Sequence, residues 1–272
     1  MCDRLIYLRG ALRPADDVSL AREADTLATR EGIFETLLVA DGVVRDACAH
    51  VDRLFAAADS LGLGLRESRT RLLETVRSVA SGAQTPWARL RITAFEDGGD
   101  AEIIVTTAAY VPPAPTDYAR GVPVTLARNA CVRRADESRR VKSLAWRRQG
   151  EALLKAAPSS YEVVLLNDSG RLAEGVRTNV VVRRGGIAMT PPLSEGCLPG
   201  TVRNWLVRSG AVLERDLEVS EVLSGGEVVL TNSLVGVIPV ARIDDTRCEV
   251  VGLAGKLRAA WEAAHPTSSM AC

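Results

Sequence analysis

Histidine and lysine are scarce in this chain of 272 residues. Its only histidines are His50 and His265, and its only lysines are Lys142, Lys155 and Lys256, although lysine and arginine together number 34. A histidine-based metal site or a Ser-His-Asp triad therefore has almost no side chains from which it could be built. Chemistry that needs a Schiff-base amine must use one of the three lysines.

Long apolar runs and an excess of charge of one sign are absent as well. No apolar run approaches the roughly 20 residues that a transmembrane helix needs, so the sequence does not predict a membrane protein. Basic and acidic residues number 34 each, which makes the formal net charge +0 at pH 7. We therefore do not expect a nucleic acid or an anionic membrane surface as the main partner.

The cysteines follow no pattern of a metal site or a redox motif. Neither a CxxC pair nor any other ligand-like spacing occurs, and no signal peptide is recognised before them. The six cysteines are Cys2, Cys48, Cys131, Cys197, Cys248 and Cys272. We expect reduced thiols and a cytoplasmic protein.

Length and composition indicate a globular protein with one large or two medium domains. Apolar residues make up 47% of the chain and charged residues 25%, which is ordinary for such proteins. Residues 112–121 are expected to be an interdomain linker, because the closely spaced prolines resist both helix and sheet. The prediction is an α+β protein with a smaller domain over 1–111 and a larger domain over 122–272.

Turn dipeptides and apolar periodicity divide these domains into short elements. A β-hairpin is predicted over residues 31–45, EGIFETLLVADGVVR, because apolar runs flank the turn Asp41-Gly42. The other strands are predicted within 1–12 and over 88–95, 102–107, 122–126, 162–166, 179–183, 227–230 and 234–240. The helices are predicted over 50–61, 67–81, 146–157, 200–209 and 252–264, with a short one within 216–223.

The stretch from Tyr161 to Arg203 organises the chain. Between its strands lies a polar corner that contains Glu174 and Asn179. Gly200 and Thr201 then open a helix, and the free backbone N–H groups of such a start can bind a phosphate. An acidic corner, a phosphate-binding turn and a preceding lysine together suggest pyridoxal phosphate.

Each candidate residue also has a plain structural interpretation. Lys142 could belong to a solvated basic segment, whereas as a Schiff-base amine it would need a lowered pKa, to which the nearby Arg139 and Arg140 would contribute. Lys155 and Lys256 lie on amphipathic helices, where a lysine most simply extends into water.

The acidic and polar candidates are equally ambiguous when taken singly. Glu174 could be a surface carboxylate, or it could bind the protonated pyridine nitrogen of the cofactor. Arg53 could be a helix-surface charge or a bidentate phosphate clamp. Residues 231–233, Thr-Asn-Ser, could be an ordinary turn or a set of phosphate donors at a strand end.

Taken together, six segments in order resemble the class IV aminotransferase family of fold-type IV pyridoxal-phosphate enzymes. These segments are EGIFETLLV, HVDRL, VKSLAW, EVVLLNDSGRLAEGVRTNV, TPPLSEGCLPGTVR and TNSLVGVIPV, and they cover nearly the whole chain. The resemblance implies a two-lobed fold like those of D-amino-acid and branched-chain aminotransferases. It also implies a homodimer.

The resemblance implies roles for individual residues. Lys142 carries the Schiff base and moves protons, and Glu174 contacts the pyridine nitrogen. The other residues implied to hold or support the cofactor are Arg53, Asn179, Thr201, Val202 and Ser233. Many members have a threonine where Val202 stands, so that hydroxyl contact is lost here or moved to Thr201. Arg30-Glu31-Gly32 replaces a GDG of the family, a change that bears on the substrate pocket.

Within the family, the C-terminal segment TNSLVGVIPV and the length are most like 4-amino-4-deoxychorismate lyases, which release pyruvate to form 4-aminobenzoate, a folate precursor. The alternative is an aminotransferase acting on D- or branched-chain amino acids, and the non-enzymatic alternative is a degenerate scaffold that binds no cofactor. Thr36 and Arg91 are candidates for contacting a substrate carboxylate, although each could be a surface residue of its strand.

Overall fold

The computed structural model describes residues 5–15, 30–134 and 141–266 of the chain. The contacts among these residues divide the described chain into two compact units. The N-terminal unit comprises the described residues up to Pro112, together with Lys142–Ala145 and the C-terminal residues from His265. The C-terminal unit comprises Pro113–Val141, as far as described, and Trp146–Ala264. Each unit contains both helices and strands, which confirms the mixed α and β architecture expected from the sequence.

The N-terminal unit is built on an antiparallel sheet with the strand order β2-β1-β6-β5-β3-β4. Its strands are β1 (Leu5–Leu8), β2 (Ala11–Pro14), β3 (Gly32–Ala40), β4 (Val43–Val44), β5 (Trp87–Asp97) and β6 (Asp100–Ala109). The predicted hairpin is confirmed as β3 and β4 around the left-handed residues Asp41 and Gly42. Every residue of β3 after Gly32 is buried, so this strand lies in the core of the unit.

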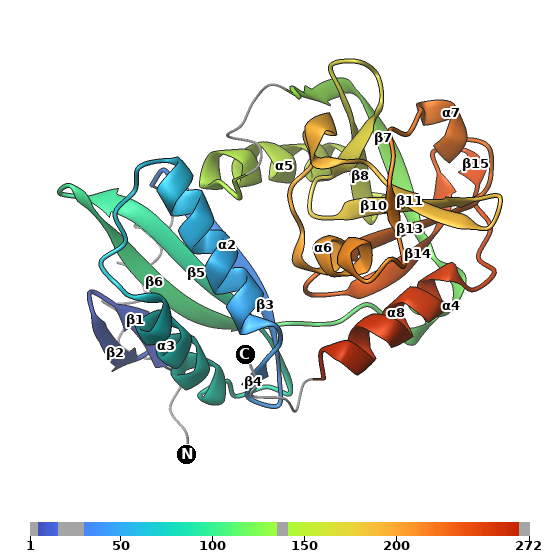
Figure 1. The fold of residues 1–272 in the computed structure, drawn as a ribbon. Coiled ribbons are helices and arrows are strands. Elements are labelled where there is room, and N and C mark those ends of the chain that lie inside the picture. Colours follow the sequence, from blue (N-terminus) through green and yellow to red (C-terminus); the bar gives the residue numbers. More distant parts are fainter. Residues whose placement is uncertain (1–4, 16–29, 135–140, 267–272) are drawn as a thin grey trace. The chain divides into compact units, whose positions relative to one another are not determined.

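Two helices, α2 (Ala47–Ser60) and α3 (Arg69–Ser81), lie side by side and pack on this sheet (Figure 1). Both were predicted from apolar residues at helical spacing, and most of these residues are buried, among them Val51 and Leu54 of α2 and Leu72 and Val76 of α3, whereas Leu61 is exposed. The hydroxyl of Ser68 caps α3 by accepting a hydrogen bond from the Arg71 backbone at 3.2 Å.

The C-terminal unit contains a second sheet, with the order β12-β11-β10-β13-β14-β7-β8-β9 and β15 paired to β14. Its strands are β7 (Val122–Val132), β8 (Glu162–Asn167), β9 (Leu172–Gly175), β10 (Asn179–Arg184), β11 (Ile187–Thr190), β12 (Leu213–Glu214), β13 (Glu227–Asn232), β14 (Gly236–Ile243) and β15 (Thr246–Arg247). Its helices are α4 (Pro115–Arg120), α6 (Thr201–Arg208), α7 (Val219–Val222) and α8 (Leu253–Ala264), with the 3-10 turn η2 (Leu193–Glu195). Helix α5 (Leu144–Ala156) begins in the N-terminal unit and continues here.

This second sheet is buried on both faces, which explains its unbroken apolar strands. Val181 packs with Leu206 of α6 and Trp261 of α8 in one cluster, whereas its neighbours Val180 and Val182 belong to the cluster on the other face. Because successive residues of a strand point to opposite faces, a run such as Val180–Val182 satisfies both clusters.

Three expectations need correction. The proline-rich segment contains the helix α4, because Pro115 stands at the first helical turn, where its fixed φ and missing N–H are tolerated. Lys142 groups with the N-terminal unit by its contacts, although the expected boundaries placed it in the C-terminal domain. Cys48 is disulfide-bonded, so the expectation of reduced cysteines is wrong for it, whereas the thiols of Cys131, Cys197 and Cys248 are free.

Candidate functional site

In the N-terminal unit, Lys142 is attached to strand β3 through its backbone. The Phe34 N–H donates to the Lys142 carbonyl at 2.9 Å, and Ser143 forms an antiparallel bridge with Ile33. The Nζ atom of Lys142 lies 5.2 Å from the centroid of the Phe34 ring, over its face. The side chain is partly buried, so this lysine is held at the edge of the sheet and is not a fully solvated surface residue. Arg139 and Arg140, expected to lower its pKa, lie outside the described residues.

Thr36 and Arg91, predicted separately as substrate contacts, are direct neighbours in the structure. They are cross-strand partners in the pairing of β3 with β5, so their side chains share one face of the sheet. Phe34 lies on that face too, two residues before Thr36. The Arg91 guanidinium carbon stands 4.5 Å from the centroid of the Phe34 ring. One aromatic ring therefore contacts both a lysine amine and a guanidinium, next to a buried threonine.

Arg53 belongs to a buried charged cluster that the sequence did not reveal. Glu35, the residue between Phe34 and Thr36, points to the opposite face of β3, where its carboxylate accepts hydrogen bonds from Nε and Nη2 of Arg53 at 2.7 and 2.6 Å. Nδ1 of His50 lies 2.7 Å from the same carboxylate. His50 and Arg53 are three residues apart on α2 and therefore reach the same side of that helix.

The charge of Glu35 is stabilised by its two partners. Burial by itself would raise the pKa of Glu35, but the positive charge of Arg53 and the hydrogen bonds from His50 and Arg53 outweigh it, so the pKa lies well below its usual range. A group whose pKa is lowered by folding stabilises the fold above its unfolded pKa, and this contribution is lost as the pH falls.

We expect Glu35→Gln to lower the free energy of unfolding by about 3 kcal/mol at pH 7, the scale for breaking a buried ion pair. Below the ordinary carboxyl pKa of 4.5, the difference from the wild type should shrink by about 1.4 kcal/mol per pH unit, because the unfolded wild-type chain takes up a proton at Glu35 while the folded protein keeps this carboxylate ionised. Urea unfolding between pH 7 and pH 3 measures this difference in the free energy of unfolding. The exposed Glu74, paired with Arg71 on α3, provides the control Glu74→Gln, which should cost almost nothing. A difference that stayed constant with pH would contradict the assigned charge.

In the C-terminal unit, the side chains of Glu174 and Asn179 both form hydrogen bonds with the backbone of Leu198. Oε2 of Glu174 accepts the Leu198 N–H at 2.9 Å, and Nδ2 of Asn179 donates to the Leu198 carbonyl at 2.8 Å. Both side chains are only 5% exposed. Glu174 lies within strand β9, which the sequence did not predict. The predicted corner thus consists of two strands joined through the backbone of Leu198, directly before the turn that opens α6.

The start of α6 fits an anion. Gly200 precedes the helix without any side-chain cap, so the first-turn N–H groups are left for another acceptor. A side chain at Gly200 would not fit, because an added Cβ would stand 2.0 Å from Oδ1 of Asn179. With glycine at position 200, the Asn179 side chain can lie directly against the start of α6. Such close packing suits a phosphate site that is built from backbone N–H groups.

Thr201 and Val202 differ in what they can offer at this helix start. Val202 is fully buried and packs in the apolar cluster with Leu206 and Trp261. Its side chain therefore serves the core, and only its backbone N–H remains for a ligand. Thr201, which is 9% exposed, is the hydroxyl-bearing residue at this turn.

Thr231 and Asn232 end strand β13, and Ser233 begins the turn that leads to β14. Asn232 shapes it, because its Oδ1 accepts the backbone N–H groups of Leu234 and Val235, both at 2.9 Å. Ser233 is half-buried in this turn, and the hydroxyl of Thr231 is buried without a hydrogen-bond partner among the described residues.

Glu162 is a second buried carboxylate that the sequence analysis missed. It accepts hydrogen bonds from the Val163 and Arg177 N–H groups at 2.9 and 3.0 Å and from the Thr178 hydroxyl at 3.1 Å. Burial raises its pKa despite these donors. It thereby fixes the turn that connects Glu174 to Asn179. An acidic residue opening the apolar run EVVLL was the available signal, as was Glu35 within IFETLLV, because a charge in a buried strand needs partners.

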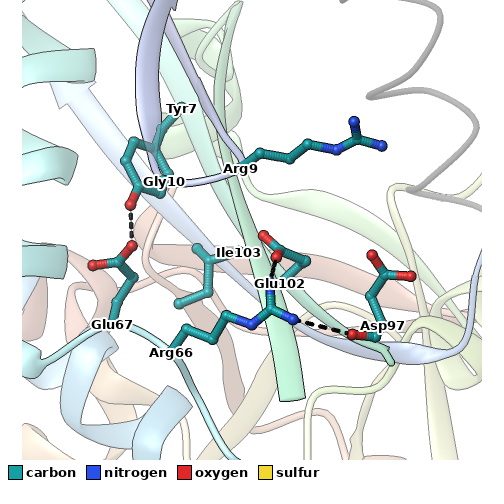
Figure 2. A pocket seen from close by; sticks show the side chains of 8 residues that line it. All are labelled: Tyr7, Arg9, Gly10, Arg66, Glu67, Asp97, Glu102 and Ile103. Carbon is teal, nitrogen blue, oxygen red and sulfur yellow. Dashed lines mark hydrogen bonds and ion pairs between the residues drawn. The ribbon is translucent and has the colours of Figure 1, made fainter. Parts of the chain in front are cut away.

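A cavity of about 410 Å³ in the N-terminal unit contains none of the predicted site residues. Figure 2 shows contacts among several of the residues that line it: Arg66 pairs with Glu102 and donates to the Asp97 carbonyl, and the Tyr7 hydroxyl donates to Glu67. Burial and the Glu67 carboxylate raise the pKa of Tyr7. These contacts connect the segment before α3 to strands β1, β5 and β6.

Within the described residues, no group of three or more histidine, cysteine or acidic side chains is arranged to hold a metal ion. No helix in the same part of the chain is long and apolar enough to cross a membrane.

Comparisons with known proteins bear on the family and the fold. The family model described as amino-transferase class IV matches residues 32–243. A probable branched-chain-amino-acid aminotransferase of Thermotoga maritima is 27% identical over 248 residues, which are 89% of this chain and 88% of that protein. A putative aminodeoxychorismate lyase of Schizosaccharomyces pombe is 29% identical over 209 residues, 74% of this chain and 85% of that one. A solved branched-chain amino acid aminotransferase of T.th. with pyridoxamine 5'-phosphate shares the fold, with a TM-score of 0.82 at 20% identity, covering 96% of this chain and 94% of the other.

Proposed function

Because the chain belongs to the class IV aminotransferase family of pyridoxal-phosphate enzymes, we propose that it is a 4-amino-4-deoxychorismate lyase. The reaction releases pyruvate from 4-amino-4-deoxychorismate and leaves 4-aminobenzoate. Family membership makes the chain an enzyme and removes the support for a degenerate scaffold.

One observation carries the proposal more than any other: of the three lysines, only Lys142 stands among groups that suit such chemistry. It is partly buried and stacked on Phe34 beside Arg91 and Thr36. Lys155 and Lys256 are exposed on helices α5 and α8. An amine that must act on a substrate carbon requires a preorganised position, which a freely solvated lysine lacks.

The residues that would hold the cofactor lie at the places already described. Arg53, the backbone N–H groups of Thr201 and Val202, and Ser233 would bind its phosphate. Glu174 would accept a hydrogen bond from the ring nitrogen, and Asn179 would hold the strand end beside it through Leu198. The donors are backbone amides, a hydroxyl and a guanidinium, which is the chemistry that a phosphate dianion demands.

When bound, pyridoxal phosphate supplies an electron sink that stabilises negative charge at the carbon bearing the substrate amine. The Lys142 amine takes the proton from that carbon. Glu174 keeps a proton on the ring nitrogen. The bond between the ring carbon and the enolpyruvyl oxygen would then break, which makes the substrate ring aromatic. The departing enolpyruvate would take up a proton at its methylene carbon and leave as pyruvate, so the two products together account for every atom of the substrate.

Arg91 and Thr36 would bind a substrate carboxylate. A guanidinium held by stacking on Phe34 has a defined orientation, and such a group can bind a carboxylate through two parallel hydrogen bonds. 4-Amino-4-deoxychorismate offers two carboxylates, whereas an ordinary amino acid offers one. Arg91 therefore suits one carboxylate of the lyase substrate, and it would suit the single carboxylate of an amino acid as well.

An aminotransferase acting on branched-chain or D-amino acids is the second candidate. The long match to the Thermotoga maritima protein, which extends over 89% of this chain, favours it. The lyase is supported by the segment TNSLVGVIPV and by the Schizosaccharomyces pombe relative. The two activities share the residues named above and differ in the substrate pocket.

Substrate assays distinguish them. Incubation of the purified protein with pyridoxal phosphate and 4-amino-4-deoxychorismate should yield equal amounts of 4-aminobenzoate and pyruvate, with no need for a 2-oxo acid. A parallel panel of L- and D-amino acids with 2-oxoglutarate should show much slower turnover. If turnover occurs only in the amino-acid panel and depends on 2-oxoglutarate, the aminotransferase assignment replaces the lyase.

The proposed setting is a homodimer in the cytoplasm, where folate precursors are made. Sedimentation of the purified protein tests the dimer directly.

A further inference from the structure

We propose that Glu35 and His50 are positioning residues that hold the Arg53 guanidinium in a single orientation for clamping the cofactor phosphate. The inference rests on the proposed function, because it takes Arg53 to be a phosphate ligand. It extends that function by explaining how an arginine on a helix becomes a rigid anion clamp, and by giving the buried histidine a role.

The contact with Glu35 fixes the orientation of the Arg53 guanidinium. A single hydrogen bond would let the planar group swing, whereas the parallel bonds from Nε and Nη2, at 2.7 and 2.6 Å, fix both its plane and its direction. These bonds engage the edge of the guanidinium that Nε and Nη2 form.

His50 fixes the carboxylate in turn. It is 1% exposed and its Nδ1 lies 2.7 Å from Oε2 of Glu35, the oxygen that also receives Nη2 of Arg53. Because the ionised carboxylate only accepts hydrogen bonds, Nδ1 carries the proton. Nε2 is buried and has no hydrogen-bond partner among the described residues, so the hydrogen bond at Nδ1 is what holds the ring in register. By this hydrogen bond, His50 holds the Glu35 carboxylate in one orientation.

Charge balance favours the same arrangement. The Arg53 side chain is 14% exposed, and a guanidinium that far from water requires an opposite charge or a strong acceptor. Glu35 supplies that charge before any cofactor arrives, so Arg53 does not fold away to find another partner. A clamp that is ordered in advance loses less entropy on binding.

The same strand segment also positions the reactive lysine. The Phe34 backbone holds Lys142, and the next side chain, Glu35, holds Arg53 from the other face of β3. Two successive residues in a buried strand thus set the positions of the proposed covalent anchor and of the phosphate clamp. This explains why an acidic residue occupies an otherwise apolar strand.

Binding of two probes that differ only in the phosphate tests the proposal. Dissociation constants for pyridoxal phosphate and for pyridoxal are measured by absorbance titration of cofactor-free full-length protein. Glu35→Gln should weaken pyridoxal phosphate binding by roughly 10- to 100-fold, as for outer partners that orient metal ligands. Pyridoxal binding should change less than about threefold. Arg53→Met should show the same selectivity, and adding Glu35→Gln to it should cost little more, because the clamp is already gone.

A histidine pair provides a second measurement if Glu35→Gln fails to fold. His50→Asn keeps an amide donor near the position of Nδ1, whereas His50→Leu removes it. Only His50→Leu should lose phosphate selectivity. Glu74→Gln, an equal change at an exposed ion pair on α3, should leave both dissociation constants as in the wild type.

The outcomes distinguish failure of the proposed function from failure of the positioning role of Glu35 and His50. If the wild type forms no adduct with either probe, the proposed function fails and this inference fails with it. If the wild type binds pyridoxal phosphate but the Glu35 and His50 variants weaken both probes equally, or neither, these residues only support the fold and the inference is overturned. Loss confined to the phosphorylated probe supports it.

Discussion

Lys142→Ala should abolish the visible absorbance that appears when the wild-type protein is mixed with pyridoxal phosphate, and should lower turnover by about 10⁴-fold or more. The variant loses both the amine that bonds to the cofactor and the base that takes the substrate proton, and acid-base catalysis alone is worth up to about 10⁴-fold. Folding should change little, because the Lys142 contact with Phe34 that holds the segment is a backbone hydrogen bond.

The other two lysines provide matched controls. Lys155→Ala and Lys256→Ala remove exposed amines from α5 and α8 and should retain absorbance and turnover. Borohydride reduction of the wild type, followed by peptide mass spectrometry, should place the cofactor on residue 142. An adduct on Lys155 or Lys256, or a Lys142→Ala variant with normal turnover, would reject the central assignment.

Glu174→Gln should lower turnover by about 100- to 1,000-fold while the protein still binds the cofactor. A glutamine oxygen can still accept the Leu198 N–H, so the corner between β9 and β10 should persist. The neutral amide, however, cannot hold a proton on the ring nitrogen as a carboxylate does. Loss of one preorganised charge-stabilising group costs about 10²- to 10³-fold in other enzymes.

Steady-state kinetics with a separately measured cofactor affinity distinguish the chemical role of Glu174 from a structural one. The expected loss lies in kcat, with a cofactor dissociation constant within a few-fold of the wild type. Glu151→Gln, at an exposed ion pair with Arg147 on α5, should match the wild type. If Glu174→Gln lost activity only through loss of cofactor, and excess cofactor restored it, the carboxylate would be a structural residue.

Much of this architecture could be predicted from local pattern. The hairpin of β3 and β4, the helices α2 and α3, and the glycine that opens α6 follow from turn dipeptides and apolar spacing, which act within a few residues. Six motifs in order identified the family, which the match over residues 32–243 confirms. Scarcity of lysine narrowed the Schiff-base candidates to three before any fold was known.

Other features depended on neighbours distant in the chain. Strand β9 was missed because its four residues carry no clear periodicity and are ordered by pairing with β8. Thr36 and Arg91 were proposed singly, and only the register of β3 against β5 makes them partners. The linker helix α4 escaped because proline was taken only as a breaker, although the first turn of a helix accepts it.

By itself, the sequence determined the family, most of the elements in their order and which side chains could do chemistry, because these depend on residue types and short spacings. The tertiary structure decided which charges are buried and how they pair. Glu35, His50 and Arg53 show the difference, since a carboxylate in an apolar strand is only an anomaly until the facing helix supplies its partners. The buried carboxylate stays charged as part of this cluster, because a desolvated charge persists only where opposite charge and hydrogen bonds compensate it.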